Sequence, residues 1–311
     1  MPAVRIIITG AKGQLGTELL SMLKNESDVE VIGLGREELD ITSYNQVKKK
    51  MLEIMPDIII HAAAYTNVDM AEEDSDKAFL VNGIGTRNLA KVSSKIKAKF
   101  VYISTDYVFS GSNNEPIEEL EAPSPLSVYG QTKLAGEYYV KKNLETFFIV
   151  RTSWIYGRYG KNFVKSMLEL SEEKGRITVV DDQIGSPTYT VDLAQCIMRL
   201  IFTEKYGVYH VTNSGSCSWY EFAKAIFEEA NIEVDLVPCK TEEFPRKAPR
   251  PCYSVLNDTM LRKNGFPKMR NWRDALKNFL HLFLKDVTEE NDVNGQAEEN
   301  LTRAGEVNGY K

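Results

Sequence analysis

The sequence has no long hydrophobic run, no excess of positive charge, and few cysteines and histidines. No apolar stretch approaches the roughly 18 residues of a membrane-spanning helix. The N-terminus MPAVRIIITG lacks the small-residue cleavage pattern of a signal peptide, so we expect a cytoplasmic protein without a membrane partner. With 38 Lys and Arg against 44 Asp and Glu, the net charge of −6 argues against a nucleic-acid partner.

The cysteines and histidines form no recognisable metal-binding or disulfide pattern. The four cysteines are spaced too widely for a CxxC motif or a dense disulfide framework. None of the three histidines belongs to an HxH or HxxxH pair, so the sequence predicts no histidine-rich metal centre.

What the first 155 residues do contain is an alternation of short apolar runs and amphipathic stretches. The apolar runs are VRIIIT, VEVIGL, DIIIHA, FVYIST and FFIVRT. Such alternation predicts βαβ units, and hence an α/β fold with a doubly wound, Rossmann-type parallel sheet. The glycine motif that follows the first apolar run identifies this part as an NAD(P)-binding domain.

Beyond this part the pattern loosens, which predicts a second domain. We expect residues 156–286 to form mainly a smaller, mixed α/β substrate-binding domain, with residues of about 185–213 returning to the first domain. Residues 287–311 carry six acids and two bases without periodicity, which predicts a disordered acidic tail.

The first apolar run leads into the glycine triplet Gly10, Gly13 and Gly16, and an amphipathic segment follows. In a βαβ unit these glycines allow a tight turn and let the backbone approach a pyrophosphate at the helix N-terminus. The alternative is an ordinary turn before a helix.

Arg36, after the second apolar run, can pair with the 2′-phosphate of NADP, which favours NADPH over NADH. A solvated loop charge remains the alternative for Arg36, since Glu37 and Glu38 follow it.

Four YxxxK pairs occur, and position distinguishes one of them. Tyr129 follows the hydroxyl-rich strand end Ser104-Thr105 by about 25 residues and opens a helical segment. At i, i+4 spacing, the Lys133 ammonium can lower the pKa of the Tyr129 phenol. Tyr129 can then exchange a proton with a substrate oxygen, which Thr105 can also bind, as ketone reduction requires.

Taken together, GxxGxxG, HAAA, NxxGxxN, STD and YxxxK resemble the extended short-chain dehydrogenase/reductases. Within them, the chain from about residue 5 to 285 is most similar to the dTDP-4-dehydrorhamnose reductases. The segments that carry this resemblance are ITGAKGQLG, LDIT, AAYTNVD, STDYVFSG, YGQTKLAGE, RTSWIYG, DDQIGSPT and RPCYSVL.

The resemblance implies NADPH-dependent reduction of the C4 ketone of dTDP-4-dehydro-β-L-rhamnose, with Tyr129, Lys133 and Thr105 as catalytic residues. It implies a nucleotide-sugar site that includes Asp106 and Trp154, both also compatible with plain structural roles. The glycine triplet, Arg36, Tyr129 and Lys133 are expected to contact the cofactor. The further residues expected to contact it are Gln14, Leu15, Asp40, Ile41, Ala63, Ala64 and Tyr65.

Related sugar-nucleotide 4,6-dehydratases carry Thr-Asp-Glu where this chain has Thr105-Asp106-Tyr107. Without the Glu the elimination base is missing, which favours simple hydride transfer. Two alternatives stay open: a 4-ketoreductase or 4-epimerase for another nucleotide sugar, and a non-catalytic NADP-binding regulatory subunit.

Arg250 lies in a Pro-rich basic segment and is a candidate partner for the pyrophosphate of a nucleotide sugar, with a surface loop charge as the equal alternative. Some members of the resembled family depend on Mg²⁺, but no carboxylate cluster here predicts such a site. The sequence leaves monomer and homodimer open.

Overall fold

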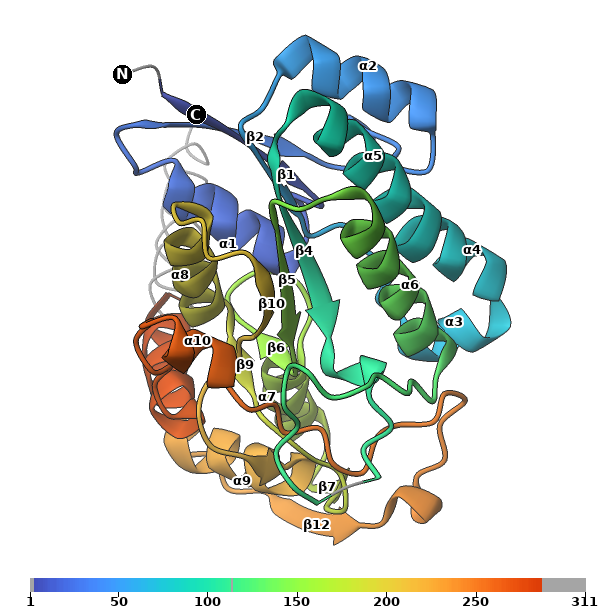
Figure 1. Cartoon of the computed structure of the whole chain (residues 1–311). Helices are drawn as coiled ribbons and strands as arrows, with labels where there is room; N and C mark the ends of the chain where they lie inside the picture. The colour runs from blue at the N-terminus through green and yellow to red at the C-terminus, as the bar shows by residue number, and fades with distance from the viewer. Residues whose placement is uncertain (1–2, 113, 287–311) are drawn as a thin grey trace, which may run out of the picture.

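The computed structural model describes residues 3–112 and 114–286, and the predicted tail lies outside these residues. Its centre is a six-stranded sheet in the order β10-β5-β4-β3-β1-β2, with all neighbouring strands parallel (Figure 1). The predicted doubly wound α/β fold is therefore confirmed. The strands are β1 (Val4–Thr9), β2 (Val29–Leu34), β3 (Ile58–His61), β4 (Lys99–Thr105), β5 (Phe147–Thr152) and β10 (Gly207–His210).

Helices cover both faces of this sheet because successive strand residues point to opposite sides. On β1, Ile6 and Ile8 pack with α1 and α8, whereas Ile7 packs with α2, α5 and α6 on the other face. The short strands are apolar on both sides for this reason. The helices are α1 (Gln14–Leu23), α2 (Tyr44–Ile54), α5 (Thr86–Ile96), α6 (Val128–Asn143) and α8 (Thr190–Ile201).

Between β3 and α5 the chain forms short helical pieces that lie beside α6 (Figure 1). The first of them begins after the N-cap Asn67, whose side chain accepts a hydrogen bond from the backbone of Met70 at 3.1 Å. These pieces are α3 (Val68–Glu73), α4 (Ser75–Phe79) and the π-helical turn η1 (Leu80–Gly85).

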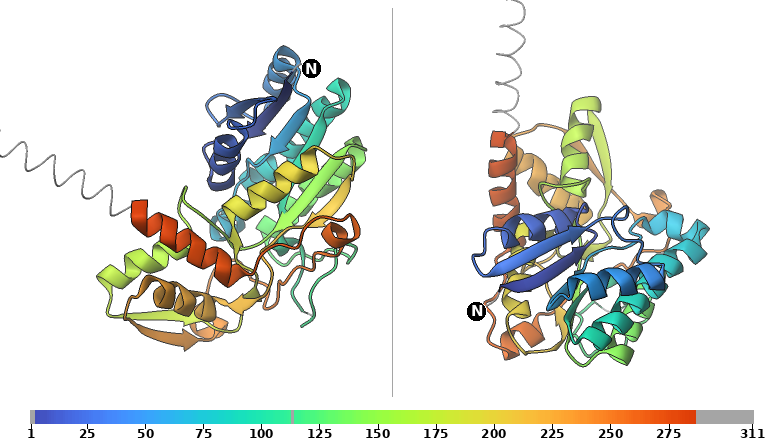
Figure 2. Two further views of the ribbon diagram at one scale, coloured as in Figure 1. Left: turned by 90° about the vertical axis from the view of Figure 1, so that its left-hand side faces the viewer. Right: turned by 90° about the horizontal axis from the view of Figure 1, so that it is seen from above.

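A second core lies beyond the carboxyl ends of the sheet strands (Figures 1 and 2). Its parallel pair β7 (Arg176–Val180) and β12 (Asp235–Cys239) packs against α7 (Phe163–Glu173) and α9 (Trp219–Ala230). Residues 272–286 are helical and supply Phe279 to this core. The predicted domain boundaries stay a prediction. The remaining pieces are β6 (Ile155–Tyr156), β8 (Ile184–Gly185), β9 (Thr188–Tyr189), β11 (Cys217–Ser218), α10 (Thr259–Lys263) and the 3₁₀ turns η2 (Asp106–Val108) and η3 (Thr241–Glu243).

A buried ion pair fastens α6 to the sheet. Arg151 of β5 donates to both carboxylate oxygens of Glu137 on α6, from Nε at 2.8 Å and from Nη2 at 2.7 Å. Ser104 of β4 donates to the same carboxylate at 2.7 Å. The exposed fractions of the two charged side chains are 1% and 0%, so each charge depends mainly on the other for compensation. Lys141 on α6 adds a longer contact with Glu137, at 3.7 Å.

We expect Arg151→Met to lower the free energy of unfolding by about 3–5 kcal/mol, because the buried Glu137 carboxylate loses its bidentate partner. Among the described residues, the carboxylate keeps only the Ser104 hydroxyl and the more distant Lys141 ammonium, at 3.7 Å. The matched control is Arg273→Met, which removes an exposed guanidinium paired with Glu228 and Glu229 and should cost less than about 1 kcal/mol. Urea unfolding of both variants measures the difference. If Arg151→Met and Arg273→Met unfolded at the same urea concentration, the buried position of the Glu137–Arg151 pair would add no stability.

Candidate functional site

A cavity of about 1070 Å³ runs along the carboxyl ends of the sheet strands and reaches the second core. This is the edge at which open α/β sheets bind ligands, and the volume is large enough for a dinucleotide together with a second small molecule. All predicted site residues except Arg250 line the cavity. They are Gly10, Gly13, Gln14, Leu15, Gly16, Arg36, Asp40, Ile41, Ala63, Ala64, Tyr65, Thr105, Asp106, Tyr129, Lys133 and Trp154.

One end of the cavity is formed by the turn from β1 into α1. A Cβ at Gly16 would lie only 2.1 Å from the carbonyl oxygen of Gly10, so the turn can close this tightly only with glycine at that position. Gly13 is the N-cap of α1, and its side-chain-free backbone leaves the first turn of the helix open to the cavity. This arrangement fits the pyrophosphate of a dinucleotide.

Next to this turn, Arg36 faces the cavity while its acidic neighbours are engaged elsewhere. Lys12 forms ion pairs with Glu37 at 3.0 Å and with Glu38 at 3.2 Å. The two carboxylates are thus held by Lys12, a lining residue that the sequence analysis did not single out. Asp40 lines the cavity too, and its Oδ1 accepts hydrogen bonds from the backbone and hydroxyl of Thr42 at 2.9 and 2.7 Å.

Tyr129 is placed by the first turn of α6. Ser127 caps this helix by accepting a hydrogen bond from the backbone of Gly130 at 3.1 Å. A Cβ at Gly130 would lie 2.1 Å from the carbonyl oxygen of Tyr107, so glycine lets the helix start press against the end of β4. The rings of Tyr107 and Tyr129 meet edge to face, with centroids 5.6 Å apart. Tyr107 therefore lines the site next to the catalytic candidates.

Lys133 follows one turn later and is fully enclosed. Its Nζ donates to the carbonyl oxygen of Ile103 at 2.6 Å and lies 4.2 Å from the centre of the Tyr102 ring. Burial lowers the pKa of Lys133 to about 7, which the nearby Glu137 carboxylate opposes.

The expectation that Lys133 lowers the pKa of Tyr129 is wrong for this structure. Burial raises the pKa of the Tyr129 phenol to about 12, and a hydrogen bond with Thr105 opposes that rise. The ammonium is directed at the Ile103 carbonyl and the Tyr102 ring, so desolvation of the phenol dominates. Tyr129 is consequently a firmly protonated donor at neutral pH.

Asp106 offers a buried acceptor beside this pair. Its Oδ1 accepts a hydrogen bond from the Thr105 hydroxyl at 3.0 Å, whereas Oδ2 has no hydrogen-bond partner among the described residues. Burial raises the pKa of Asp106 to about 6. A buried carboxylate oxygen without a partner is costly, and a hydroxyl of a bound ligand would compensate it.

The far end of the cavity is closed by two stacked tryptophans. The ring of Trp154 lies 3.6 Å from that of Trp219, with an interplanar angle of 10°. Trp154 has a φ of 46°, an uncommon conformation for a large side chain, and such conformations cluster at functional sites. Trp219 comes from the start of α9, and no motif in the sequence marks it as a site residue.

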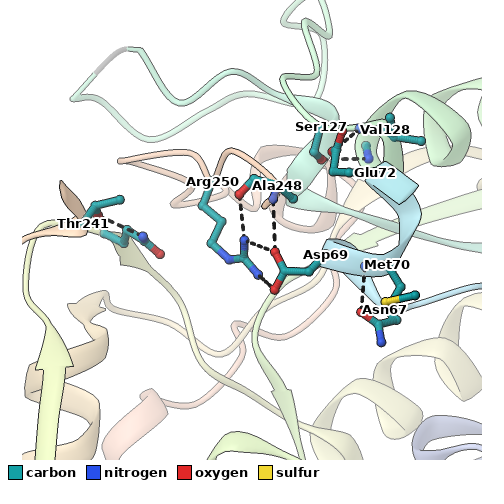
Figure 3. Close-up of polar contacts among 11 residues, drawn as sticks. Asn67, Asp69, Met70, Glu72, Ser127, Val128, Thr241, Ala248 and Arg250 are labelled. Carbon is teal, nitrogen blue, oxygen red and sulfur yellow. Dashed lines mark hydrogen bonds and ion pairs between the residues drawn. The ribbon is translucent and has the colours of Figure 1, made fainter. Parts of the chain in front are cut away.

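Arg250 does not line this cavity. Both of its outer nitrogens are bound to the carboxylate of Asp69 on α3, at 2.9 and 3.0 Å, and Nη1 also donates to the carbonyl oxygen of Ala248 at 2.7 Å (Figure 3). The assignment of Arg250 to a pyrophosphate stays a prediction. Asp69 itself was not singled out, because nothing in the sequence links it to a residue 181 positions later.

In the part of the chain that the structure describes, no group of three or more His, Cys, Asp or Glu side chains is arranged to hold a metal ion. His61 is buried and lies between the hydroxyls of Thr9 and Thr86, at 2.7 and 3.0 Å. Burial lowers its pKa to about 3, which makes it a neutral structural residue.

Among the residues that the structure describes, no helix is both long and apolar enough to cross a bilayer.

The pairing of a dinucleotide-type turn with a Tyr–Lys–Thr cluster agrees with the comparison to known families. A family model described as the RmlD substrate-binding domain matches residues 4–284. The chain belongs to this family. The resemblance inferred from the motifs is therefore confirmed over nearly all of the described residues.

Several individual proteins are similar to this chain over most of its length. The spore coat polysaccharide biosynthesis protein SpsK of Bacillus subtilis is 45% identical, covering 89% of this chain and 96% of that protein. A dTDP-4-dehydrorhamnose reductase of Aggregatibacter actinomycetemcomitans is 39% identical, covering 88% and 97%. The crystal structure of dTDP-4-dehydrorhamnose reductase from Bacillus anthracis in complex with NADP is 51% identical, covers 89% and 98%, and gives a TM-score of 0.88.

Proposed function

We propose that this protein uses NADPH to reduce the C4 ketone of dTDP-4-dehydro-β-L-rhamnose to dTDP-β-L-rhamnose. The observation that carries the proposal is a single cavity that is lined both by a pyrophosphate-type turn and by Tyr129, Thr105 and Asp106. The names of the similar reductases, and the NADP bound to one of them, support the same activity. The reaction draws on cytoplasmic metabolites, so we place it in the cytoplasm.

The residues present fit a dinucleotide. The tight approach of Gly16 to Gly10 provides the backbone cradle for its pyrophosphate, and Arg36 provides a cation for a 2′-phosphate. NADPH supplies a hydride when it is bound. The role of Lys133 is to hold the nicotinamide ribose from the floor of the cavity.

The proton needed by the reduced oxygen comes from this chain. When the C4 carbon gains a hydride, its oxygen becomes an alkoxide, and Tyr129 donates the phenolic proton to it. Thr105 donates a hydrogen bond to the same oxygen and so stabilises the developing charge. Asp106 accepts from a sugar hydroxyl through its free Oδ2, and Trp154, held by its stacking on Trp219, lines the part of the cavity that receives the sugar.

The proposal is tested by mixing the protein with NADPH or NADH and a panel of 4-keto-6-deoxy sugar nucleotides. We expect stoichiometric loss of reduced cofactor with dTDP-4-dehydro-β-L-rhamnose, and faster loss with NADPH than with NADH. Interconversion of 4-epimers without cofactor consumption would instead identify an epimerase. Binding of NADPH without turnover of any substrate would identify a non-catalytic subunit.

We expect Tyr129→Phe to lower kcat by about 10²–10⁴-fold, because the general acid is lost, while the Kd for NADPH changes little. Steady-state kinetics and fluorescence titration with NADPH measure the two effects. Tyr138→Phe is the matched control, since Tyr138 lies on the same helix, is 56% exposed and has its own i+4 lysine, Lys142. Wild-type turnover by Tyr129→Phe would exclude it as the proton donor.

The lowered pKa of Lys133 predicts a pH dependence of cofactor capture. Because kcat/KM for NADPH reports the free protein, it should fall as pH rises through about 7, where Lys133 loses its proton and its attraction for the anionic cofactor. Lys133→Met should lack this change. If the pH profile of kcat/KM for NADPH fell with an apparent pKa of about 10.4, that of an exposed lysine, the proposed environment of Lys133 would be contradicted.

A further inference from the structure

Helix α3 lies between the first turn of α6 and a segment that we call the strap, residues 244–251 (Figure 3). Two acidic side chains of α3, Asp69 and Glu72, contact these two neighbours. They are three residues apart on the same short helix, and each contacts a different neighbour (Figure 3).

Asp69 binds the strap through three hydrogen bonds. Its carboxylate accepts from Arg250 Nη1 at 2.9 Å, from Arg250 Nη2 at 3.0 Å and from the backbone of Ala248 at 3.1 Å. The side chains of Asp69 and Arg250 are only 27% and 17% exposed. Such a bidentate, partly buried pair fixes both distance and orientation.

Glu72 binds the start of the catalytic helix. Its Oε1 accepts a hydrogen bond from the backbone nitrogen of Val128 at 2.9 Å. Val128 is the first residue of α6 and directly precedes Tyr129. A first-turn nitrogen has no acceptor within its own helix, so Glu72 provides a bond that the helix cannot supply.

The strap is also anchored to the second core. Three residues before its beginning, the backbone nitrogen and hydroxyl of Thr241 donate to Asp182, at distances of 2.6 to 3.1 Å. Beyond its end, the carbonyl oxygen of Cys252 accepts from the backbone of Ile184 at 2.8 Å. The strap thus reaches from the predicted substrate-binding part across to α3.

We propose that Asp69 and Glu72 are positioning residues, and that α3 couples the seating of the strap to the placement of Tyr129. When Arg250 and Ala248 bind Asp69, α3 is held in place, and Glu72 then fixes the backbone next to the proton donor. Displacements of about 1 Å at a reacting group can cost about 10²-fold in rate, so a loose α6 start lowers kcat. This inference rests on the proposed reductase function.

The test combines kinetics with hydrogen–deuterium exchange of the full chain. We expect Asp69→Asn to increase exchange in residues 244–251 and also in residues 127–131, to lower kcat about tenfold, and to leave the Kd for NADPH unchanged. Arg250→Lys, which keeps the charge but loses the bidentate geometry, should increase exchange in the same two segments. It also keeps the test decisive if Asp69→Asn does not fold.

Glu73→Gln is the matched control. Glu73 lies on the same helix and pairs with Lys247 of the same strap, but the two side chains are 43% and 61% exposed. An exposed pair contributes little, so exchange and kcat should match the wild type. Glu72→Ala should loosen residues 127–131 and lower kcat, whereas Glu72→Gln, whose amide oxygen still accepts a hydrogen bond, should restore both.

Faster exchange of residues 244–251 alone in Asp69→Asn, with kcat unchanged, would overturn the coupling. So would wild-type kcat in Glu72→Ala. The exchange measurement needs no substrate, so it decides the coupling even if the wild-type protein reduces no sugar nucleotide. That second result would reject the proposed function instead.

Discussion

The site depends on the buried ion pair between Glu137 and Arg151. It fastens α6 to the ends of β4 and β5, and α6 carries both Tyr129 and Lys133. The Glu137 carboxylate also raises the pKa of Lys133 against the effect of burial. The Glu137–Arg151 ion pair therefore holds α6 against the sheet, and its carboxylate helps the buried Lys133 ammonium keep its proton.

From this anchor, the placement of Tyr129 follows by close packing. The helix start presses on the carbonyl of Tyr107 because Gly130 has no side chain, and Glu72 and Ser127 accept hydrogen bonds from two of its first-turn nitrogens, those of Val128 and Gly130. Desolvation then raises the pKa of the phenol, which suits a donor that must keep its proton until the substrate oxygen becomes charged. Packing and proton chemistry at this site have the same origin.

Several features could be predicted because they depend on local sequence. The alternation of apolar runs and helices predicted the parallel sheet, and the glycine spacing predicted the turn that lines the cavity. The pKa of Tyr129 could not be predicted in this way. It depends on how completely the phenol is buried and on where the Lys133 ammonium points, and both follow from segments distant in the chain.

By itself, the sequence determined the parallel α/β fold, the family and part of the cavity lining, including the glycine turn, Tyr129 and Lys133. Strand periodicity, glycine turns and i, i+4 spacing act over a few residues, so they can be recognised locally. Only the tertiary structure decided that Trp219 stacks on Trp154, that Lys12 holds Glu37 and Glu38, and that Asp69 binds Arg250. These contacts join residues brought together by chain crossovers and packing of the two cores, which local spacing does not encode.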